Sequence, residues 1–234
     1  MQLTVIGSSP AWPNPGSAQS GYLLEGAASG KLLLDCGPGV LGRLRARGPL
    51  DVDAVAITHF HLDHWGDLVP WAWLSAYGDA GMRAELWLPP GGSEQLATFA
   101  SFWGNDAMFD RAFELHEYER GVPFEAAGFT IEARQVPHYT LTAFGFRVSE
   151  NGRLLAYSGD SAPGEQLADL ARGADLFLCE ATLKSPDRDG PPRGHLTAEE
   201  AHAASDGRLL LTHRPIELPL DGDDVACDGL VVDV

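Results

Sequence analysis

Residues 54–64 read AVAITHFHLDH, in which a short apolar run leads directly into three histidines and an aspartate. Such a run is suited to a strand that is buried on both faces. Where the chain continues in an extended or turn conformation, His59 and His61 point to the same side. Asp63 and His64 follow on the next turn, where they can reach a second ion. Because imidazole nitrogen and carboxylate oxygen are good ligands for Zn²⁺, Mn²⁺ and Fe²⁺, the stretch predicts a metal site at a strand end.

Three more polar residues follow strand-like apolar runs later in the chain. They are His138 after Ile131–Val136, Asp160 after Leu154–Tyr157, and His213 after Leu209–Thr212. Strand ends are the usual place for binding sites in layered folds. A lone histidine at a strand end is more often structural, but three such ends together with one HxHxDH stretch indicate a shared site.

Short strands come in groups that a few helices separate. The expected strands are Leu3–Gly7, Gly21–Leu24, Lys31–Asp35, Ala54–Thr58, Leu86–Leu88, Phe113–Tyr118, Phe129–Val136, Ala143–Ser149, Leu154–Tyr157, Leu176–Cys179, Leu209–Thr212 and Gly229–Val234. The expected helices are Val40–Ala46, Leu68–Tyr77, one from Ser93 toward Trp103, Ala162–Arg172, and one that Thr197 caps. Two sheets face to face, with helices outside, would bury all these runs. We therefore expect an α/β (α+β) fold in one domain, residues 1–234, made of two related halves.

Composition and charge exclude several classes of protein. Of the 234 residues, 44% are hydrophobic and 21% are charged, which is typical of globular proteins and excludes a disordered or fibrous chain. The formal net charge of −17 repels phosphate backbones and argues against a nucleic-acid partner. It is compatible with a small anionic substrate held by a metal ion, because a local cation overrides the mean field.

The sequence also bears on the setting of the protein. Because a membrane span needs a run of about 18 apolar residues, which this chain lacks, we expect no membrane partner. The start, MQLTVIGSSP, does not resemble a signal peptide. Cys36, Cys179 and Cys227 are odd in number and lack zinc-finger spacing, which favours free thiols and a cytoplasmic location.

The polar motifs occur in the order of a known superfamily. HFHLDH at 59–64, the isolated His138, SGD at 158–160 and TH at 212–213 resemble the metallo-β-lactamase superfamily over nearly the whole chain. The resemblance implies an αββα four-layer sandwich with two divalent metal ions at one edge and a bridging hydroxide as nucleophile. It assigns the ligands as His59, His61 and His138 for one ion, Asp63, His64 and His213 for the other, and Asp160 as the bridge. Zn²⁺ is the favoured ion, and Mn²⁺ and Fe²⁺ suit the same ligands.

Two further segments resemble the ribonuclease Z-like subgroup. CEAT at 179–182 resembles its HEAT segment, with Cys179 in place of the leading histidine, and GHLTAEEA at 194–201 resembles its HxT/S-A segment. In that subgroup the histidine of the second segment contacts the scissile phosphate. The resemblance therefore implies that His195 binds phosphate or protonates the leaving oxygen, and that Glu180 orients His195. Asp63 is expected to accept a proton from the attacking water.

Four functions compete on these residues. Segments 21–24, 31–42 and 154–179 resemble small cyclic-nucleotide phosphodiesterases of the superfamily, which favours a small phosphodiester as substrate. A tRNA 3′-end endonuclease fits the same motifs, but the charge of −17 and the lack of a long basic arm between Trp65 and His138 oppose it. An ester, thioester or lactam hydrolase is less favoured, because such lactamases often carry Cys where Asp160 stands. A metal-binding or redox module is the weakest alternative.

Other features remain open at this stage. Asp35 is expected to support the metal ligands through hydrogen bonds rather than bind metal itself. His116 and His202 lack partners in the pattern and are interpreted as structural or exposed. The Trp-rich stretch Trp65–Tyr77 is compatible with core, with a pocket wall or with the face of a homodimer, and the loop 183–194 with a solvated loop or a substrate cover.

Overall fold

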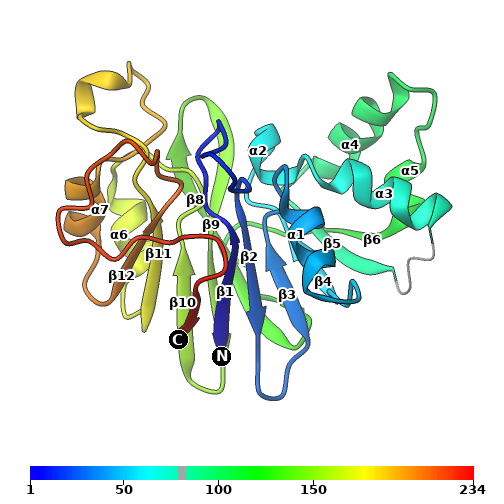
Figure 1. Cartoon of the computed structure of the whole chain (residues 1–234), viewed down its shortest axis with the longest axis horizontal. Helices are drawn as coiled ribbons and strands as arrows, with labels where there is room; N and C mark the ends of the chain where they lie inside the picture. The colour runs from blue at the N-terminus through cyan, green and yellow to red at the C-terminus, as the bar shows by residue number, and fades with distance from the viewer. Residues whose placement is uncertain (79–82) are drawn as a thin grey trace.

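The computed structural model of the chain describes residues 1–78 and 83–234. Two β-sheets lie face to face at the centre, and helices cover the outer face of each sheet (Figure 1). Because successive side chains of a strand point to opposite faces, the strands of the first sheet serve two cores. Leu32 and Leu34 pack between the two sheets, whereas Leu33 packs against the outer helices.

The first sheet is mixed. In spatial order its strands are β13 (Val231–Asp233), β1 (Gln2–Gly7), β2 (Gly21–Glu25), β3 (Lys31–Leu34), β4 (Ala54–Ala56), β5 (Ala84–Leu88) and β6 (Phe113–Glu117). The strands from β3 to β6 are parallel, and β13, β1, β2 and β3 pair antiparallel.

The second sheet is mixed in the same way. Its strands in order are β12 (Leu209–Thr212), β11 (Leu176–Glu180), β10 (Arg153–Tyr157), β9 (Leu141–Glu150), β8 (Phe129–His138) and β7 (Phe124–Ala126). The strands β10, β11 and β12 are parallel, and β7 to β10 pair antiparallel.

The helices form the two outer layers. Beside the first sheet lie α1 (Val40–Arg47), α3 (Leu68–Tyr77), α4 (Gly92–Ser101) and α5 (Met108–Ala112), with the single turn α2 (Leu62–Trp65) at its edge (Figure 1). Beside the second lie α6 (Glu165–Ala171) and α7 (Ala198–Ala204), and a short 3₁₀ turn spans Pro186–Arg188. Among the described residues, no helix has the length and apolar character needed to cross a bilayer.

Three buried apolar clusters separate the four layers. The outer helices of the first sheet pack on it through residues such as Leu44 and Trp71. Phe146 and its neighbours fill the space between the sheets, and Leu167 and Leu170 of α6 pack on the second sheet. Burial of each such side chain stabilises the fold by about 1.5–3 kcal/mol. The predicted αββα four-layer architecture is confirmed.

Strand direction decides where the polar residues meet. The parallel strands β4, β10, β11 and β12 end at the same edge of the sandwich, and β8 also ends there (Figure 1). Residues that follow these strands in sequence are therefore neighbours in space, as the sequence predicts.

The N-terminus of α4 differs from the prediction. Its N-cap is Gly91, not Ser93, and Gly91 has no side chain to cap the helix. Gly91 adopts a φ of 78°, which glycine tolerates at little cost. The backbone N–H of Ser93 instead donates to Glu117 at 2.9 Å, so a carboxylate from β6 satisfies the helix end.

The start of α6 also differs from the prediction, and the sequence pattern does not predict three short elements. Helix α6 begins at Glu165 rather than Ala162, because Pro163 disfavours a helical backbone at Ala162 and the chain is still extended at Gly164. The elements α2, α5 and β7 span four, five and three residues, too few for a periodic pattern. Helix α3 has the predicted bounds, and Thr197 caps α7 as predicted, in a capping box with Glu200.

Candidate metal centre

Seven side chains with metal-ligating atoms converge at the edge where the strands end. All seven are those that the sequence assigns to two ions, and they form two overlapping groups in which the ligand atoms lie within 4.8 Å of one another. The groups are His59, His61, His138 and Asp160, and Asp63, His64, Asp160 and His213.

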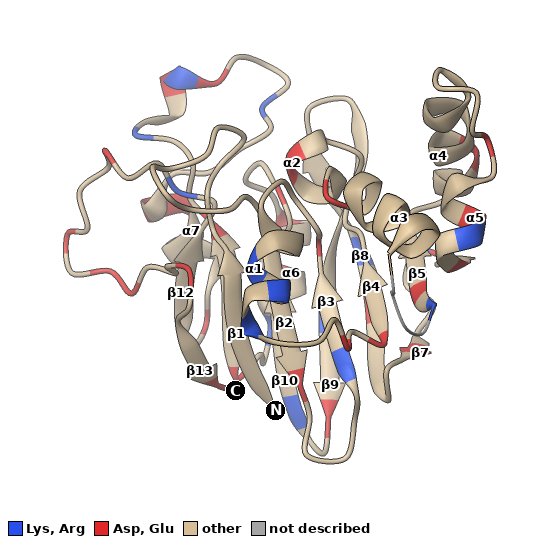
Figure 2. Cartoon of the chain, turned by 45° about the vertical axis from the view of Figure 1, so that its right-hand side comes forward, with Lys and Arg blue, Asp and Glu red and all other residues tan. Residues whose placement is uncertain are grey.

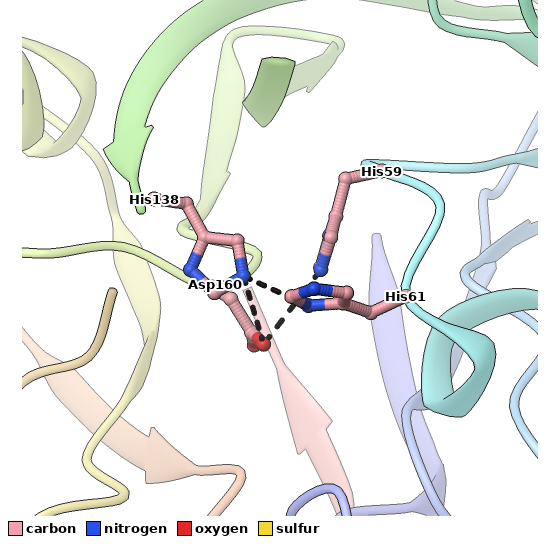
Figure 3. A group of neighbouring side chains, drawn as sticks. All are labelled: His59, His61, His138 and Asp160. Carbon is pink, nitrogen blue, oxygen red and sulfur yellow. Dashed lines mark hydrogen bonds and ion pairs between the residues drawn. The ribbon is translucent and has the colours of Figure 1, made fainter. Parts of the chain in front are cut away.

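The first group joins the loop after β4 to the end of β8 (Figure 3). The Nε2 atoms of His59 and His138 lie 3.8 and 3.9 Å from Oδ2 of Asp160. His138 Nε2 also lies 2.9 Å from Nδ1 of His61. His59, His138 and Asp160 are buried, and His61 is half-buried, so one side of this group is open to solvent.

The second group is buried throughout. His64 Nε2 lies 3.2 Å from Oδ1 of Asp160 and 3.5 Å from Oδ2 of Asp63. His213 Nε2 lies 3.0 Å from the same oxygen of Asp63. Asp160 thus directs Oδ2 to the first group and Oδ1 to the second, which is the arrangement required of a bridging carboxylate.

These residues fit a pair of divalent cations. Among the residues that the structure describes, buried His59 Nε2, His64 Nε2 and Asp160 Oδ1 have no hydrogen-bond partner. Buried polar atoms normally have partners, and a metal ion satisfies such lone pairs. Imidazole and carboxylate are donors that suit Zn²⁺, Mn²⁺ and Fe²⁺.

The electrostatics of the two groups differ. Burial lowers the pKa of His59, His61 and His138, so these rings favour the neutral form that binds a metal. Burial also disfavours the charged form of His64, but the surrounding carboxylates, led by Asp160, outweigh it and raise the pKa of His64 well above its usual value. Positive charge is therefore stabilised in the second group, and a proton or a metal ion can supply it.

A second set of contacts orients the imidazoles. The Nδ1 atoms of four rings have partners away from the centre, which leaves each Nε2 directed inward. The pairs are His59 with Thr58 Oγ1 (3.0 Å), His64 with Asp35 Oδ2 (2.7 Å), His138 with the Gly194 carbonyl (2.7 Å) and His213 with Thr182 Oγ1 (2.8 Å).

Asp35 takes the supporting position that the sequence predicts for it. Besides His64, this buried carboxylate accepts hydrogen bonds from the backbone N–H of Thr58 at 2.8 Å and from the hydroxyl of Tyr157 at 2.7 Å. Its φ of 58° lies in the left-handed region, as does the φ of 52° of His213. Such backbone strain in residues other than glycine is typical of functional sites.

His195 lies beside the second group. Its Nδ1 is 2.9 Å from Oε1 of Glu180 and 4.0 Å from Asp160, and its ring stacks on that of His213 with centroids 5.7 Å apart. Burial lowers the pKa of His195, but the carboxylates of Glu180 and Asp160 outweigh it and raise the pKa to about 9. These carboxylates therefore favour the protonated form of the ring.

The loop before His195 contains an anchor that the sequence reasoning missed. One carboxylate oxygen of Asp189 accepts the backbone N–H groups of Gly194 and His195, at 2.7 and 3.0 Å. Arg193 forms a two-pronged ion pair with Glu200 at 2.7 and 2.8 Å. Asp189 sits in the short segment DRDGPPR, where only its place before two prolines could have signalled a turn.

The other histidines lie outside the site. His202 is exposed on α7 and pairs with Asp223 at 2.7 Å, and His116 stacks on Trp87 with ring centroids 4.5 Å apart. Of the Trp-rich stretch, Trp65 and Trp71 belong to the core, whereas Tyr77 is 81% exposed.

Comparisons of sequence connect the chain with known proteins. Residues 31–213 match the family model described as a beta-lactamase superfamily domain. An uncharacterized protein of Mycobacterium leprae is 37% identical over 226 residues, covering 92% of this chain and 78% of the relative. The probable metallo-hydrolase YhfI of Bacillus subtilis is 30% identical over 228 residues, covering 92% and 87%. A ribonuclease Z of Mycobacterium bovis is 28% identical over 240 residues, covering 91% and 85%.

Solved structures share the fold. The crystal structure of YhfI from Bacillus subtilis has a TM-score of 0.85 at 25% identity and covers 99% of each chain. Zinc-bound PqqB from Methylobacterium extorquens has a TM-score of 0.79 at 20% identity, with all of both chains covered. A diphosphatase of the PhnP family has a TM-score of 0.76 at 20% identity, covering 100% of this chain and 97% of the other. At such identities the last two show the fold alone.

Proposed function

This chain belongs to the beta-lactamase superfamily, as its motifs predict, and on that premise we propose that it is a metal-dependent phosphodiesterase acting on a small phosphodiester such as a cyclic nucleotide. The observation that carries this proposal is the position of His195. It places a cationic imidazole, fixed by Glu180, beside the shared carboxylate Asp160 of the two ligand groups. An imidazolium at this place suits the negative charge of a phosphodiester and the proton needed by its leaving oxygen.

The ligand groups define the reaction centre. His59, His61 and His138 would hold one ion, Asp63, His64 and His213 the other, and Asp160 both. Two divalent ions in such a site supply an activated water nucleophile at neutral pH and stabilise the charge that develops on the phosphoryl oxygens. We propose Zn²⁺ as the native ion, with Mn²⁺ and Fe²⁺ compatible with the same donors.

Asp63 has a second role in the proposal. Burial raises the pKa of Asp63, but the imidazoles of His64 and His213 outweigh it and hold the pKa well below the usual aspartate range. The side chain is therefore a carboxylate at neutral pH. We propose that it receives a proton from the attacking water while it holds its ligand position.

His195 completes the proton balance. It donates its proton from Nε2 to the leaving oxygen as the P–O bond breaks. Glu180 positions it, because its Oε1 is bonded to Nδ1 of His195 and its Oε2 accepts the backbone N–H of Thr182 at 3.1 Å. The carboxylate thereby fixes the ring orientation and stabilises the protonated form.

Charge favours a small substrate over a polymer. The net charge is −17, and acidic residues gather on the loop that follows β12 (Figure 2). This field opposes the long phosphate backbone of tRNA, although the likeness to ribonuclease Z supports phosphodiester chemistry. The proposed partner is thus a small anionic phosphodiester, and the proposed location is the cytoplasm.

The test separates phosphodiester from acyl chemistry. Protein loaded with Zn²⁺ or Mn²⁺ is assayed with 3′,5′-cyclic AMP, a thioester and a lactam, beside the matched variant His195→Ala. We expect turnover of the cyclic nucleotide that falls strongly in the variant. Turnover of the thioester or lactam alone, or equal phosphodiester rates in both proteins, would contradict the proposal.

A further inference from the structure

An aromatic residue stands at the rim of the site without a role in the chemistry described so far. Tyr139 follows His138 directly, at the turn between β8 and β9, and is 39% exposed. Its ring centroid lies 4.8 Å from that of His138, 5.6 Å from that of His195 and 6.4 Å from that of His61. The ring therefore borders both the first ligand group and the proposed acid.

The position of this ring is fixed by the neighbouring loop. The backbone N–H of Tyr139 donates to the carbonyl of Arg193 at 3.0 Å, and its φ of 48° lies in the left-handed region. Gly194 lets the ring approach, because a Cβ at Gly194 would lie only 2.3 Å from Cε2 of Tyr139. Strain and close packing are typical of a residue that is held in place for function.

The ring lies outside the apolar cores of the fold. Among the described residues, Tyr139 belongs to none of the three apolar clusters that stabilise the layers. The aromatic rings recorded beside it are imidazoles of the site. Arg193, which also lies in the adjacent loop, is engaged by Glu200. Tyr139 thus presents aromatic surface where the organic part of a bound phosphodiester would leave the centre.

We propose that Tyr139 determines specificity by stacking against the nucleobase of a nucleotide phosphodiester, an inference that rests on the proposed function. With the phosphate between the ligand groups and His195, the base of the same nucleotide extends over the rim where this ring lies. Stacking of a base on an aromatic side chain changes affinity by about five- to 150-fold. The stacked ring has no part in proton transfer, so its effect falls on binding rather than on the chemical step.

The experiment compares two diesters that differ only in the base. One is 3′,5′-cyclic AMP, and the other is methyl riboside 3′,5′-cyclic phosphate, which carries a methoxy group in place of adenine. Both are offered to metal-loaded wild type, Tyr139→Leu, Tyr139→Phe and the matched control Tyr77→Leu, which alters an exposed tyrosine on α3. KM and kcat are measured, and binding of each diester is followed by calorimetry.

We expect Tyr139→Leu to raise KM and Kd for cyclic AMP by about five- to 150-fold, with kcat and all constants for the base-free diester unchanged. Tyr139→Phe keeps the ring and should behave as wild type, as should Tyr77→Leu. An equal loss on both diesters, or no loss on either, would overturn the inference while leaving phosphodiester turnover intact. If wild type hydrolyses neither diester, the proposed function fails, and calorimetry alone then decides whether the ring contacts the base.

Discussion

The two metal-ligand groups and the His195 segment (residues 183–197) are neighbours that the fold holds in different ways. The ligand groups lie at the ends of sheet strands, and His59 and His64 are fully buried. The His195 segment is a loop whose side chain at 195 is 13% exposed. Its position depends on polar contacts, chiefly those of Asp189 and Glu180, and on the buried side chain of Leu196.

This difference implies that metal binding and proton donation can be separated. The ligands are oriented by partners such as Asp35 and Thr182. Two of them also contact the His195 segment, because His138 bonds to the Gly194 carbonyl and His213 stacks on His195. Variants of the ligand groups should therefore remove both metal and turnover. Variants of the His195 segment should affect turnover or stability and leave metal content in place.

The largest effect is expected from loss of a ligand. Asp63→Ala or His61→Ala should abolish turnover and remove at least one metal equivalent, because each group loses a donor that its neighbours cannot replace. Metal content after dialysis and the rate on a phosphodiester check this together. Full activity with two bound ions in either variant would contradict the claim that the ligand groups, unlike the His195 segment, are required for metal binding.

A smaller and more selective loss is expected at the proposed acid. His195→Ala should lower kcat by about 10²–10⁴, the usual contribution of general acid catalysis, and leave metal content unchanged. His202→Ala is the matched control, since this histidine is exposed on α7 outside the site. Loss of metal in His195→Ala would show that the two regions act as one unit.

Replacing a residue that supports a ligand should have a smaller effect than replacing the ligand itself. Asp35→Asn replaces one acceptor oxygen by an amide N–H, which then faces either the backbone N–H of Thr58 or the donors Tyr157 and His64, and should lower metal affinity by about 10–100-fold. The ion held with His64 should leave first on titration with a chelator. Asp51→Asn, at an exposed aspartate, serves as control. Unchanged affinity at both sites would argue against the assigned role of Asp35.

The smallest effect is expected at the helix that follows His195. Thr197 caps α7 and accepts the backbone N–H of Glu200 at 3.3 Å. Thr197→Ala should lower the free energy of unfolding by about 1 kcal/mol without change in metal content. Urea unfolding measures the first quantity and metal analysis the second. A variant that retains its stability but loses metal would contradict the separation.

Local pattern was sufficient for most elements of the fold. The apolar runs predict central strands such as β4 and β11 because these strands are buried on both faces, and the capping box of α7 is encoded within four residues. The N-terminus of α4 could not be predicted, because the group that satisfies it, Glu117, is 24 positions away from Ser93 in the chain. Helix α6 begins late for a local reason, because Pro163 and the extended Gly164 precede it.

The candidate site also contains residues that the sequence predicts and residues that it does not. Its ligand residues carry distinctive chemistry and follow apolar runs, so sequence reasoning names all the residues that the structure brings together. Their supporting residues Thr58, Tyr157 and Thr182 are ordinary in sequence and become relevant only through tertiary contacts. Tyr139 and Asp189 belong to this second class, which is why neither emerges from pattern alone.

Phosphodiester hydrolysis at this site should require two bound ions. The most direct measurement is turnover of 3′,5′-cyclic AMP as Zn²⁺ or Mn²⁺ is titrated into chelator-treated protein, with His61→Ala as the blank. We expect turnover to appear as the second equivalent binds and the blank to stay inactive. Full turnover without added metal, or equal turnover in His61→Ala, would contradict it.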